Sequence, residues 1–228
     1  MITAVVCDGM GGVSGGSIAS TIAAESFQKE LDNCESTYRL FANLSDEEIE
    51  HILVSAAEEA NHAVYKRGKA DSSLSGMGTT LVGCIAMPHR IYTVNVGDSR
   101  MYMNAGDGLI QITHDHSYVQ HLVDMGKLSK EEARVSRNKN LITRAIGTDR
   151  TVDVDFFITE YDDRDAVLLL CSDGLTNHVE EAELEKIMSG ACSREGIQEV
   201  CEKMISCANS RGGTDNITAV AIAIVAEQ

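Results

Sequence analysis

Residues 79–113 read TTLVGCIAMPHRIYTVNVGDSRMYMNAGDGLIQIT, which is a series of apolar, β-branched runs. The runs cover residues 79–87, 90–96, 101–104 and 109–113. Each break between them is two to four residues long and contains a proline or a glycine. Strands this close in sequence are joined by hairpins, because a parallel crossover needs roughly a dozen residues or more. The stretch therefore predicts an antiparallel meander.

Helical and strand patterns flank this meander without alternating regularly. Ser45 and Glu48 form a capping box that starts a helix ending near Gly68, and Ser129 with Glu132 is a second candidate box. Further strands are expected at residues 2–7, 141–146, 152–158, 166–171 and 216–225, and further helices at about 180–189 and 193–209. Segregated strands and helices predict an α+β fold.

The composition of the chain favours one acidic, cytoplasmic domain. The 228 residues contain one proline and no Ser/Gly-rich linker, so we expect a single domain over 1–228. The net charge of -16 disfavours binding to nucleic acid or anionic lipid. No apolar run approaches the ~18 residues of a membrane span, and no basic residue precedes Lys29 as a signal peptide requires. The seven cysteines show no C-x-x-C spacing and are expected to be reduced thiols.

Four aspartates beside glycines lie at the ends of apolar runs: Asp8, Asp98, Asp173 and Asp215. Burying an unpaired carboxylate costs several kcal/mol, so a positive group is expected near them. Lys and Arg are scarce there, Arg100 and Arg211 being the nearest, and oxygen ligands without Cys or His favour Mg²⁺ or Mn²⁺. The alternative is that each Asp-Gly pair is an ordinary turn.

Other motifs point less clearly to chemistry. The glycine-rich residues 9–16 fail the dinucleotide-binding spacing, since Ser14 occupies the third glycine position. The sequence His114-Asp115-His116 is more typical of a polar loop that caps a helix from Ser117 than of a metal pair. Residues 127–150 carry seven basic residues against three acidic ones. This excess is either a solvated helix face or a patch that steers a phosphorylated segment.

In chain order, five motifs resemble those of the metal-dependent type 2C (PPM) serine/threonine protein phosphatases, above all the bacterial branch. They are VVCDGMGG (5–12), GMGTT (76–80), VGDSR (96–100), LCSDGL (170–175) and GGTDNI (212–217). The resemblance implies a sandwich of two antiparallel sheets flanked by helices, a four-layer αββα arrangement, with a metal cluster at one end of the sheets. It also implies a flap next to the active site at about residues 118–140.

The resemblance further implies the roles of particular residues. Asp8 would bridge two Mg²⁺ or Mn²⁺ ions, the Gly9 carbonyl would bind one of them, and Asp173 and Asp215 would complete the first site. Asp98 would hold a third, weaker ion together with Asp173. A hydroxide bridging the two ions would then hydrolyse phosphoserine and phosphothreonine in proteins. The implied partners are phosphorylated proteins, substrates of bacterial Ser/Thr kinases.

The chain also departs from the family pattern. Members normally carry two more strands before the Asp8 motif, including an arginine that contacts the phosphate, and their absence would expose a sheet edge open to self-association. Val13 stands where the bacterial pattern has a histidine proposed as general acid, and Ser17 replaces a carboxylate. General acid catalysis contributes roughly 10²–10⁴ in rate. These departures leave open a second reading, a catalytically weak or inactive metal-binding member that regulates or binds phosphoproteins.

Overall fold

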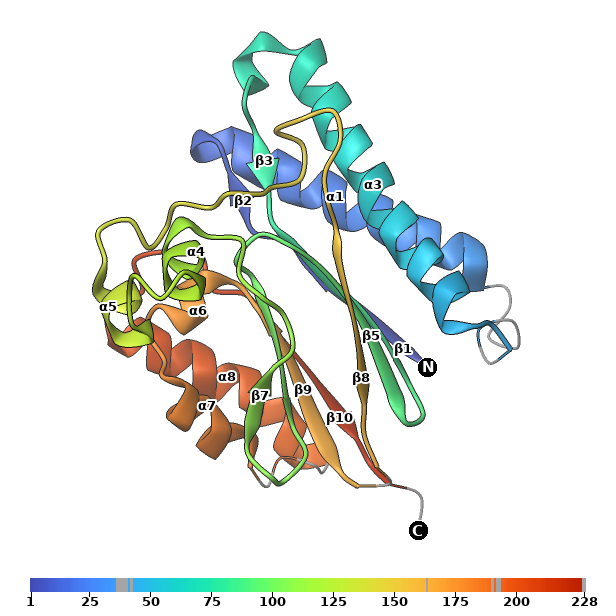
Figure 1. Ribbon diagram of the computed structural model, residues 1–228, viewed down its shortest axis with the longest axis vertical. Helices are drawn as coiled ribbons and strands as arrows, with labels where there is room; N and C mark the ends of the chain where they lie inside the picture. Colours follow the sequence, from blue (N-terminus) through green and yellow to red (C-terminus); the bar gives the residue numbers. More distant parts are fainter. Residues whose placement is uncertain (36–40, 42, 163, 190, 192–193, 227–228) are drawn as a thin grey trace.

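Two four-stranded antiparallel sheets form the centre of the molecule (Figure 1). The computed structural model describes residues 1–35, 41, 43–162, 164–189, 191 and 194–226. The first sheet has the order β1 (Ile2–Val6), β4 (Leu81–Met87), β5 (Arg90–Val96) and β8 (Asp155–Glu160). The second has the order β10 (Ala219–Ile224), β9 (Ala166–Cys171), β6 (Arg100–Asn104) and β7 (Leu109–Gln111). The expected α+β sandwich is confirmed.

Helices cover the outer face of each sheet (Figure 1). The long helices α1 (Gly12–Glu35) and α3 (Asp46–Ala70) lie on the first sheet, and α7 (Glu181–Met188) and α8 (Arg194–Ser210) lie on the second. The shorter elements are β2 (Gly9–Met10), η1 (Ser72–Leu74), β3 (Gly78–Thr79), α4 (Tyr118–Asp124), α5 (Lys130–Val135) and α6 (Asp173–Thr176). No helix in the described ranges is long and apolar enough to cross a bilayer.

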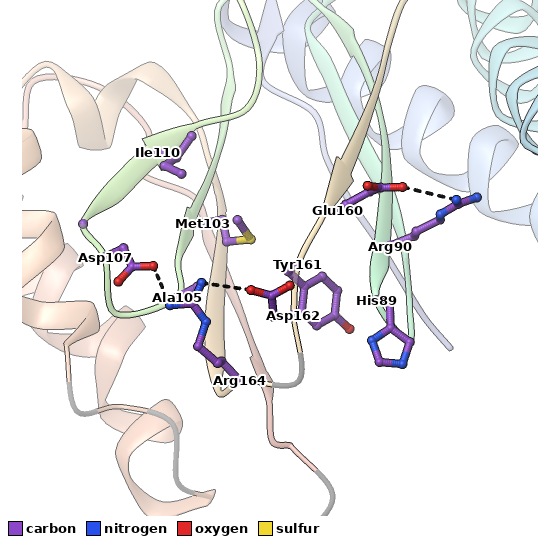
Figure 2. A pocket seen from close by; sticks show the side chains of 11 residues that line it. His89, Arg90, Met103, Ala105, Asp107, Ile110, Glu160, Tyr161, Asp162 and Arg164 are labelled. Atoms are coloured by element: carbon purple, nitrogen blue, oxygen red, sulfur yellow. Dashed lines mark hydrogen bonds and ion pairs between the residues drawn. The ribbon is translucent and has the colours of Figure 1, made fainter.

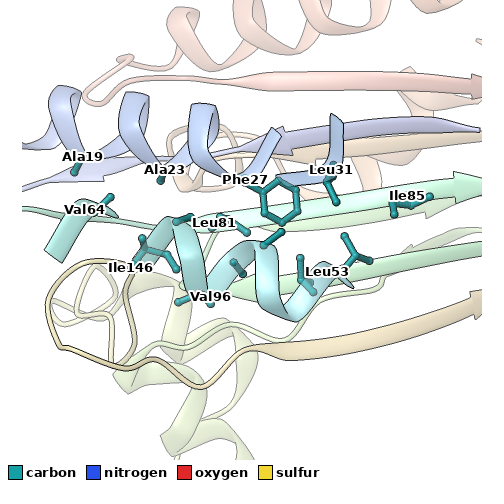
Figure 3. Packing of buried hydrophobic residues seen from close by; sticks show 14 of the residues in the cluster. Ala19, Ala23, Phe27, Leu31, Leu53, Val64, Leu81, Ile85, Val96 and Ile146 are labelled. Atoms are coloured by element: carbon teal, nitrogen blue, oxygen red, sulfur yellow. The ribbon is translucent and has the colours of Figure 1, made fainter. Parts of the chain in front are cut away.

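Alternating side chains build three apolar layers. In β4, Leu81 and Ile85 belong to the cluster under α1 and α3, where Phe27 packs (Figure 3), whereas Val82 and Cys84 point into the layer between the sheets. Strand β9 alternates in the same way between the central layer and the cluster under α7 and α8. Successive strand residues face opposite sides of a sheet, so one strand serves two layers.

The predicted meander is wrong at one point. Strands β4 and β5 pair in the first sheet and β6 and β7 pair in the second, so β5 and β6 are not neighbours. The chain changes sheets at Gly97, whose φ of 111° allows the sharp bend. Strand β6 then pairs with β9 in the second sheet, and the apolar layers on either side of that sheet bury both of its faces. Sequence spacing alone cannot distinguish a hairpin from a turn that crosses between sheets.

Both expected capping boxes are confirmed, and one expected strand is wrong. Ser45 with Glu48 caps α3, and Ser129 with Glu132 caps α5. Residues 141–146 form no strand; they make two isolated bridges, Ser117 with Ile142 and Thr79 with Ile146. The two bridges go to different segments, so no continuous ladder can form there despite the apolar composition.

Candidate metal centre

Strand register brings the four aspartates to one end of the sandwich. Val6 at the end of β1 pairs with Val82, and Leu81 pairs with Val96 at the end of β5. Asp8 and Asp98 follow these two strand ends. In the second sheet, Cys171 at the end of β9 pairs with Ala219 at the start of β10 and Arg100 at the start of β6. Asp173, which follows β9, and Asp215, which precedes β10, therefore lie at the same end.

The carboxyl groups of these residues interact with one another. Burial raises the pKa of Asp8 to about 7, with further contributions from the charges of Asp173 and Asp215. A hydrogen bond joins the Asp8 and Asp173 carboxyl groups. Burial also raises the pKa of Asp98 to about 7, followed by the charge of Asp173, and it raises the pKa of Asp173. Mutual repulsion between carboxylates in a partly buried site favours a bound cation.

Hydrogen bonds between loops hold the aspartates in these positions. The amide of Asp8 donates to Thr80 Oγ1 at 3.0 Å, and the amide of Thr80 donates to the Asp8 carbonyl at 2.8 Å. Thr80 Oγ1 also lies 2.7 Å from Ser99 Oγ, next to Asp98. Side-chain and backbone contacts between three separate loops, which carry Asp8, Thr80 and Asp98, therefore hold the two aspartates that follow strands of the first sheet.

A second set of contacts joins the Asp173 and Asp215 loops. Ser172 Oγ donates to the Asn216 carbonyl at 3.2 Å and accepts from the amide of Thr218 at 3.1 Å. The backbone of Gly174 packs against the same loop, because a Cβ built there would lie 2.2 Å from the Asn216 carbonyl oxygen. Asn177 Nδ2 donates to Asp173 Oδ2 at 2.9 Å and orients that carboxylate.

Gly9 is required for a similar close approach. A Cβ at Gly9 would lie 1.9 Å from the carbonyl oxygen of Gly16, at the first turns of α1. Gly9 therefore brings the segment after Asp8 against the helix, and it pairs with Thr79 in the ladder of β2 and β3. Val13 lies in α1, and its side chain is outside the described part of the structure.

The two arginines nearest in sequence do not neutralise the aspartates. Arg100 is bound to Asp115, with its Nη2 at 2.7 Å from Oδ2, and Arg211 is bound to Glu183 at 2.7 Å. Instead, the charge of Lys139 lowers the pKa of Asp173 against the stronger effect of burial. In the sequence, Lys139 stands out only as part of the basic excess of residues 127–150. Its position near Asp173 depends on the tertiary arrangement of residues 118–140 and therefore could not be predicted.

The donor set fits a hard divalent cation. The four carboxylates supply oxygen atoms, the ligands that Mg²⁺ and Mn²⁺ prefer. Among the described residues, no three His, Cys, Asp or Glu side chains stand close enough to form a ready-made metal cage. The four neighbouring carboxylates nevertheless repel one another, which adds to burial in raising the pKa values of Asp8 and Asp98. One lysine against four acids leaves an excess of negative charge that a divalent cation would offset.

A pocket of about 360 Å³ adjoins Asp98 and Asp173. Its lining also includes Val119 of α4, Arg134 of α5 and Lys139, which follows α5. Arg134 Nη1 lies 2.9 Å from Glu180 Oε1, so an ion pair links α5 to the start of α7. This ion pair therefore joins two elements that line the pocket.

A larger hollow of about 590 Å³ lies at the other end of β5, where the strand begins at Arg90 (Figure 2). Figure 2 shows Arg164 between Asp107 and Asp162, and Arg90 paired with Glu160. None of the four aspartates lines it. Each charged side chain that lines it takes part in an ion pair, and Arg90 has a further acidic partner, Asp46, outside the hollow. The smaller pocket, which adjoins Asp98 and Asp173, is therefore the candidate site.

The polar loop predicted at residues 114–116 is confirmed. Ser117 Oγ accepts from the amide of Gln120 and caps α4. The three side chains before it face different partners: His114 contacts Asp124, Asp115 binds Arg100, and His116 Nδ1 accepts from the amide of Gly97 at 3.0 Å. They do not form a metal pair, and His116 instead supports the loop that carries Asp98.

Comparisons with known proteins show which family the chain is similar to. The family model described as protein phosphatase 2C matches residues 1–219. The serine/threonine phosphatase stp of Listeria innocua is 40% identical over 218 residues, which cover 96% of this chain and 82% of that protein. The protein phosphatase PhpP of Streptococcus pneumoniae is 32% identical over 225 residues, covering 96% of this chain and 85% of PhpP.

Solved structures show the same fold. The serine/threonine phosphatase Stp1 from Staphylococcus aureus superposes with a TM-score of 0.85 at 31% identity, covering 99% of this chain and 84% of Stp1. The catalytic domain of the phosphatase PstP, solved with two manganese ions, gives a TM-score of 0.80 at 30% identity, covering 97% of this chain and 87% of that one. With a family model matched over residues 1–219 and the aspartate motifs gathered at one end of the sandwich, the chain belongs to the protein phosphatase 2C family.

Proposed function

We propose that this chain hydrolyses phosphoserine and phosphothreonine in proteins, using divalent cations held by Asp8, Asp173 and Asp215. The observation that carries the proposal is the convergence of the aspartates, whose mutual charge helps raise the pKa of Asp8 to about 7. Metal-dependent dephosphorylation is supported by the family and by the relatives that are named serine/threonine phosphatases. The manganese ions in the PstP structure support a divalent metal.

The proposed ligand set follows the positions of the residues. Asp8 would be shared by two cations, with the Gly9 carbonyl on one of them and with Asp173 and Asp215 completing the first site. Asp98 and Asp173 would hold a third, weaker ion. Mg²⁺ and Mn²⁺ are the proposed metals, because all donors are oxygen atoms. When bound, such cations supply an activated water molecule and neutralise charge on the phosphoryl oxygens.

The protein groups around the cations would bind and orient the substrate. Asn177 holds the Asp173 carboxylate in one orientation through its 2.9 Å hydrogen bond. Lys139 supplies a positive charge beside Asp173, where a phosphomonoester would be attracted. The pocket under α4 and α5 would accept the polypeptide on one side of the phosphorylated residue.

Residues 1–228 would act as one phosphatase domain with a flap at about 118–140, supported by the family match and by the position of α4 and α5 over the pocket. Its substrates would be products of bacterial Ser/Thr kinases in the cytoplasm. Self-association would use the edge strand β1, where Ile2 is 46% exposed. Sedimentation at increasing concentration tests that association.

The test is hydrolysis of p-nitrophenyl phosphate and of a phosphothreonine peptide by the wild type, Asp173→Asn and the control Asp153→Asn. Asp153 is an exposed acid that is not one of the four aspartates and does not line the pocket beside them. We expect the wild type and the control to turn over both substrates with Mn²⁺ and to lose activity in chelator, and we expect Asp173→Asn to be inactive.

Hydrolysis of the aryl ester alone would locate a defect in protonation of the leaving group, since Val13 offers no acid. Equal rates for the wild type and Asp173→Asn would overturn the assigned site. Metal binding without any turnover would favour the regulatory, phosphoprotein-binding alternative.

A further inference from the structure

Asp215 differs from the other three aspartates because it is exposed and precedes a strand instead of following one. The loop that carries it follows α8 and contains Gly212 and Gly213, both with positive φ. Asp8, Asp98 and Asp173 each lie two residues after the end of a strand, whereas Asp215 lies between the end of α8 and the start of β10. Its position relative to Asp8 and Asp173 therefore depends on what anchors the loop.

Arg211 anchors the beginning of this loop through two hydrogen bonds and an ion-pair contact. Its Nη1 donates to the His178 carbonyl at 2.8 Å and lies 2.7 Å from Glu183 Oε2. Its Nη2 donates to Glu183 Oε1 at 3.0 Å. Two parallel contacts to one carboxylate define the direction of a guanidinium group, which a single ion pair does not.

Two further contacts extend this cluster. His178 Nε2 lies 3.2 Å from Thr214 Oγ1, directly before Asp215, and Cys207 Sγ lies 3.2 Å from Glu183 Oε1. The far end of the loop is held by Ser172 through Asn216 and Thr218. The segment that carries Asp215 is thus fixed on both sides.

We propose that Arg211 and Glu183 are positioning residues that hold the 211–216 loop so that Asp215 can bind a divalent cation together with Asp8 and Asp173. The inference rests on the proposed function, because it takes Asp215 to be a metal ligand. It goes beyond that function in assigning a role to an ion pair between α7 and the end of α8. Arg211 contacts neither the cation nor the substrate and acts only through the loop.

The competing explanation is that the pair is an ordinary surface ion pair. Exposed ion pairs contribute little to stability, and the Arg211 side chain is 43% exposed. The same helix provides a matched control, because Lys203 Nζ lies 2.6 Å from Glu199 Oε2 and both side chains are exposed. That pair lies within α8 and contacts no part of the loop.

The experiment is calorimetric titration of Mn²⁺ into metal-free wild type, Arg211→Met, Glu183→Gln, Arg211→Lys and the control Lys203→Met, with thermal unfolding of each metal-free protein. Loss of groups that orient a ligand weakens metal affinity by about 10-fold or more. We expect this loss in Arg211→Met and Glu183→Gln, with Lys203→Met unchanged. Arg211→Lys should be intermediate, since an ammonium cannot reproduce the forked contact.

Two outcomes would overturn the assignment. The first is Mn²⁺ affinity in Arg211→Met and Glu183→Gln that matches Lys203→Met. The second is a loss of affinity that follows a loss of thermal stability, which would indicate a general structural role. Asp173→Asn distinguishes failure of the proposed metal site from failure of the proposed role of Arg211. If this variant binds Mn²⁺ as tightly as the wild type, the assignment of the metal site is wrong, whatever the result for the Arg211 variants.

Discussion

Replacing Gly174 with alanine should disturb both folding and metal binding, although it adds only one methyl group. Gly174 lies in α6, just after β9 in the chain, and its backbone packs against the loop that carries Asp215. Its backbone conformation is available to alanine, so the effect is purely steric. A Cβ would lie 2.2 Å from the carbonyl oxygen and 3.0 Å from the carbonyl carbon of Asn216. Both are backbone atoms and cannot move aside by a rotamer change.

The cost of this substitution can be worked out from the contact. An ordinary contact begins at 3.4 Å, so the Asp173 and Asp215 loops must separate by about 1 Å. Forcing extra volume into a packed site costs ~1–3 kcal/mol. At a urea slope of about 2 kcal/mol per molar, the unfolding midpoint should fall by about 0.5–1.5 M. Because the two loops carry two of the proposed ligands, we expect Mn²⁺ affinity to fall by about 10-fold or more.

Urea unfolding in chelator and calorimetric titration of Mn²⁺ measure the two effects. Gly68→Ala is the control, because Gly68 lies inside α3 and a Cβ there would lie 3.4 Å from the Leu74 carbonyl oxygen, an ordinary contact. Alanine in a helix is more stable than glycine by about 0.5–1 kcal/mol, so the same substitution should have the opposite sign there. If Gly174→Ala unfolds and binds Mn²⁺ like the wild type, the close packing of these loops is refuted.

Three more predictions concern the surroundings of the site. Burial lowers the pKa of His116, whose Nδ1 accepts a hydrogen bond from the Gly97 amide. The free energy of unfolding should therefore fall as the pH drops below about 6.5, because the imidazole of the unfolded chain takes up a proton there more readily than that of the folded protein. His116→Gln should flatten this part of the profile of stability against pH, measured by urea unfolding. Burial raises the pKa of Asp98 from 3.8 to about 7. With metal removed by chelator, the free energy of unfolding should therefore fall as the pH rises between these two values, because the folded protein holds the proton that the unfolded chain releases. Asp98→Asn should be more stable than the wild type at pH 8 but not at pH 4. Asn61 Oδ1 accepts a hydrogen bond from the amide of Gly147 at 2.7 Å. Asn61→Ala should lower the free energy of unfolding by ~1–3 kcal/mol, because it leaves this buried amide without its acceptor. An unchanged midpoint in thermal or urea unfolding would show that another group satisfies the amide.

Local patterns were sufficient for much of the fold. The capping boxes at Ser45 and Ser129 were predictable because a cap is a contact between residues three positions apart. Strands β4, β5 and β9 were predictable from apolar, β-branched composition. The same signal failed at residues 141–146, because a strand needs a partner along its length and this segment bridges two different neighbours.

The candidate ligands Asp8, Asp98, Asp173 and Asp215 could be named from the sequence, since each stands beside a glycine at the end of an apolar run and the motifs occur in a known order. The contacts that bring these four aspartates together could not be predicted from the sequence, because they depend on long-range packing. The register of two sheets brings the four loops to one end, and Lys139 reaches Asp173 only through the folding of residues 118–140. The pairing of Arg211 with Glu183 likewise spans 28 positions between α7 and the end of α8. Residue types and local spacing thus determined which chemistry is available, while tertiary structure decided which charges meet, because electrostatic contacts depend on distance in space and not along the chain.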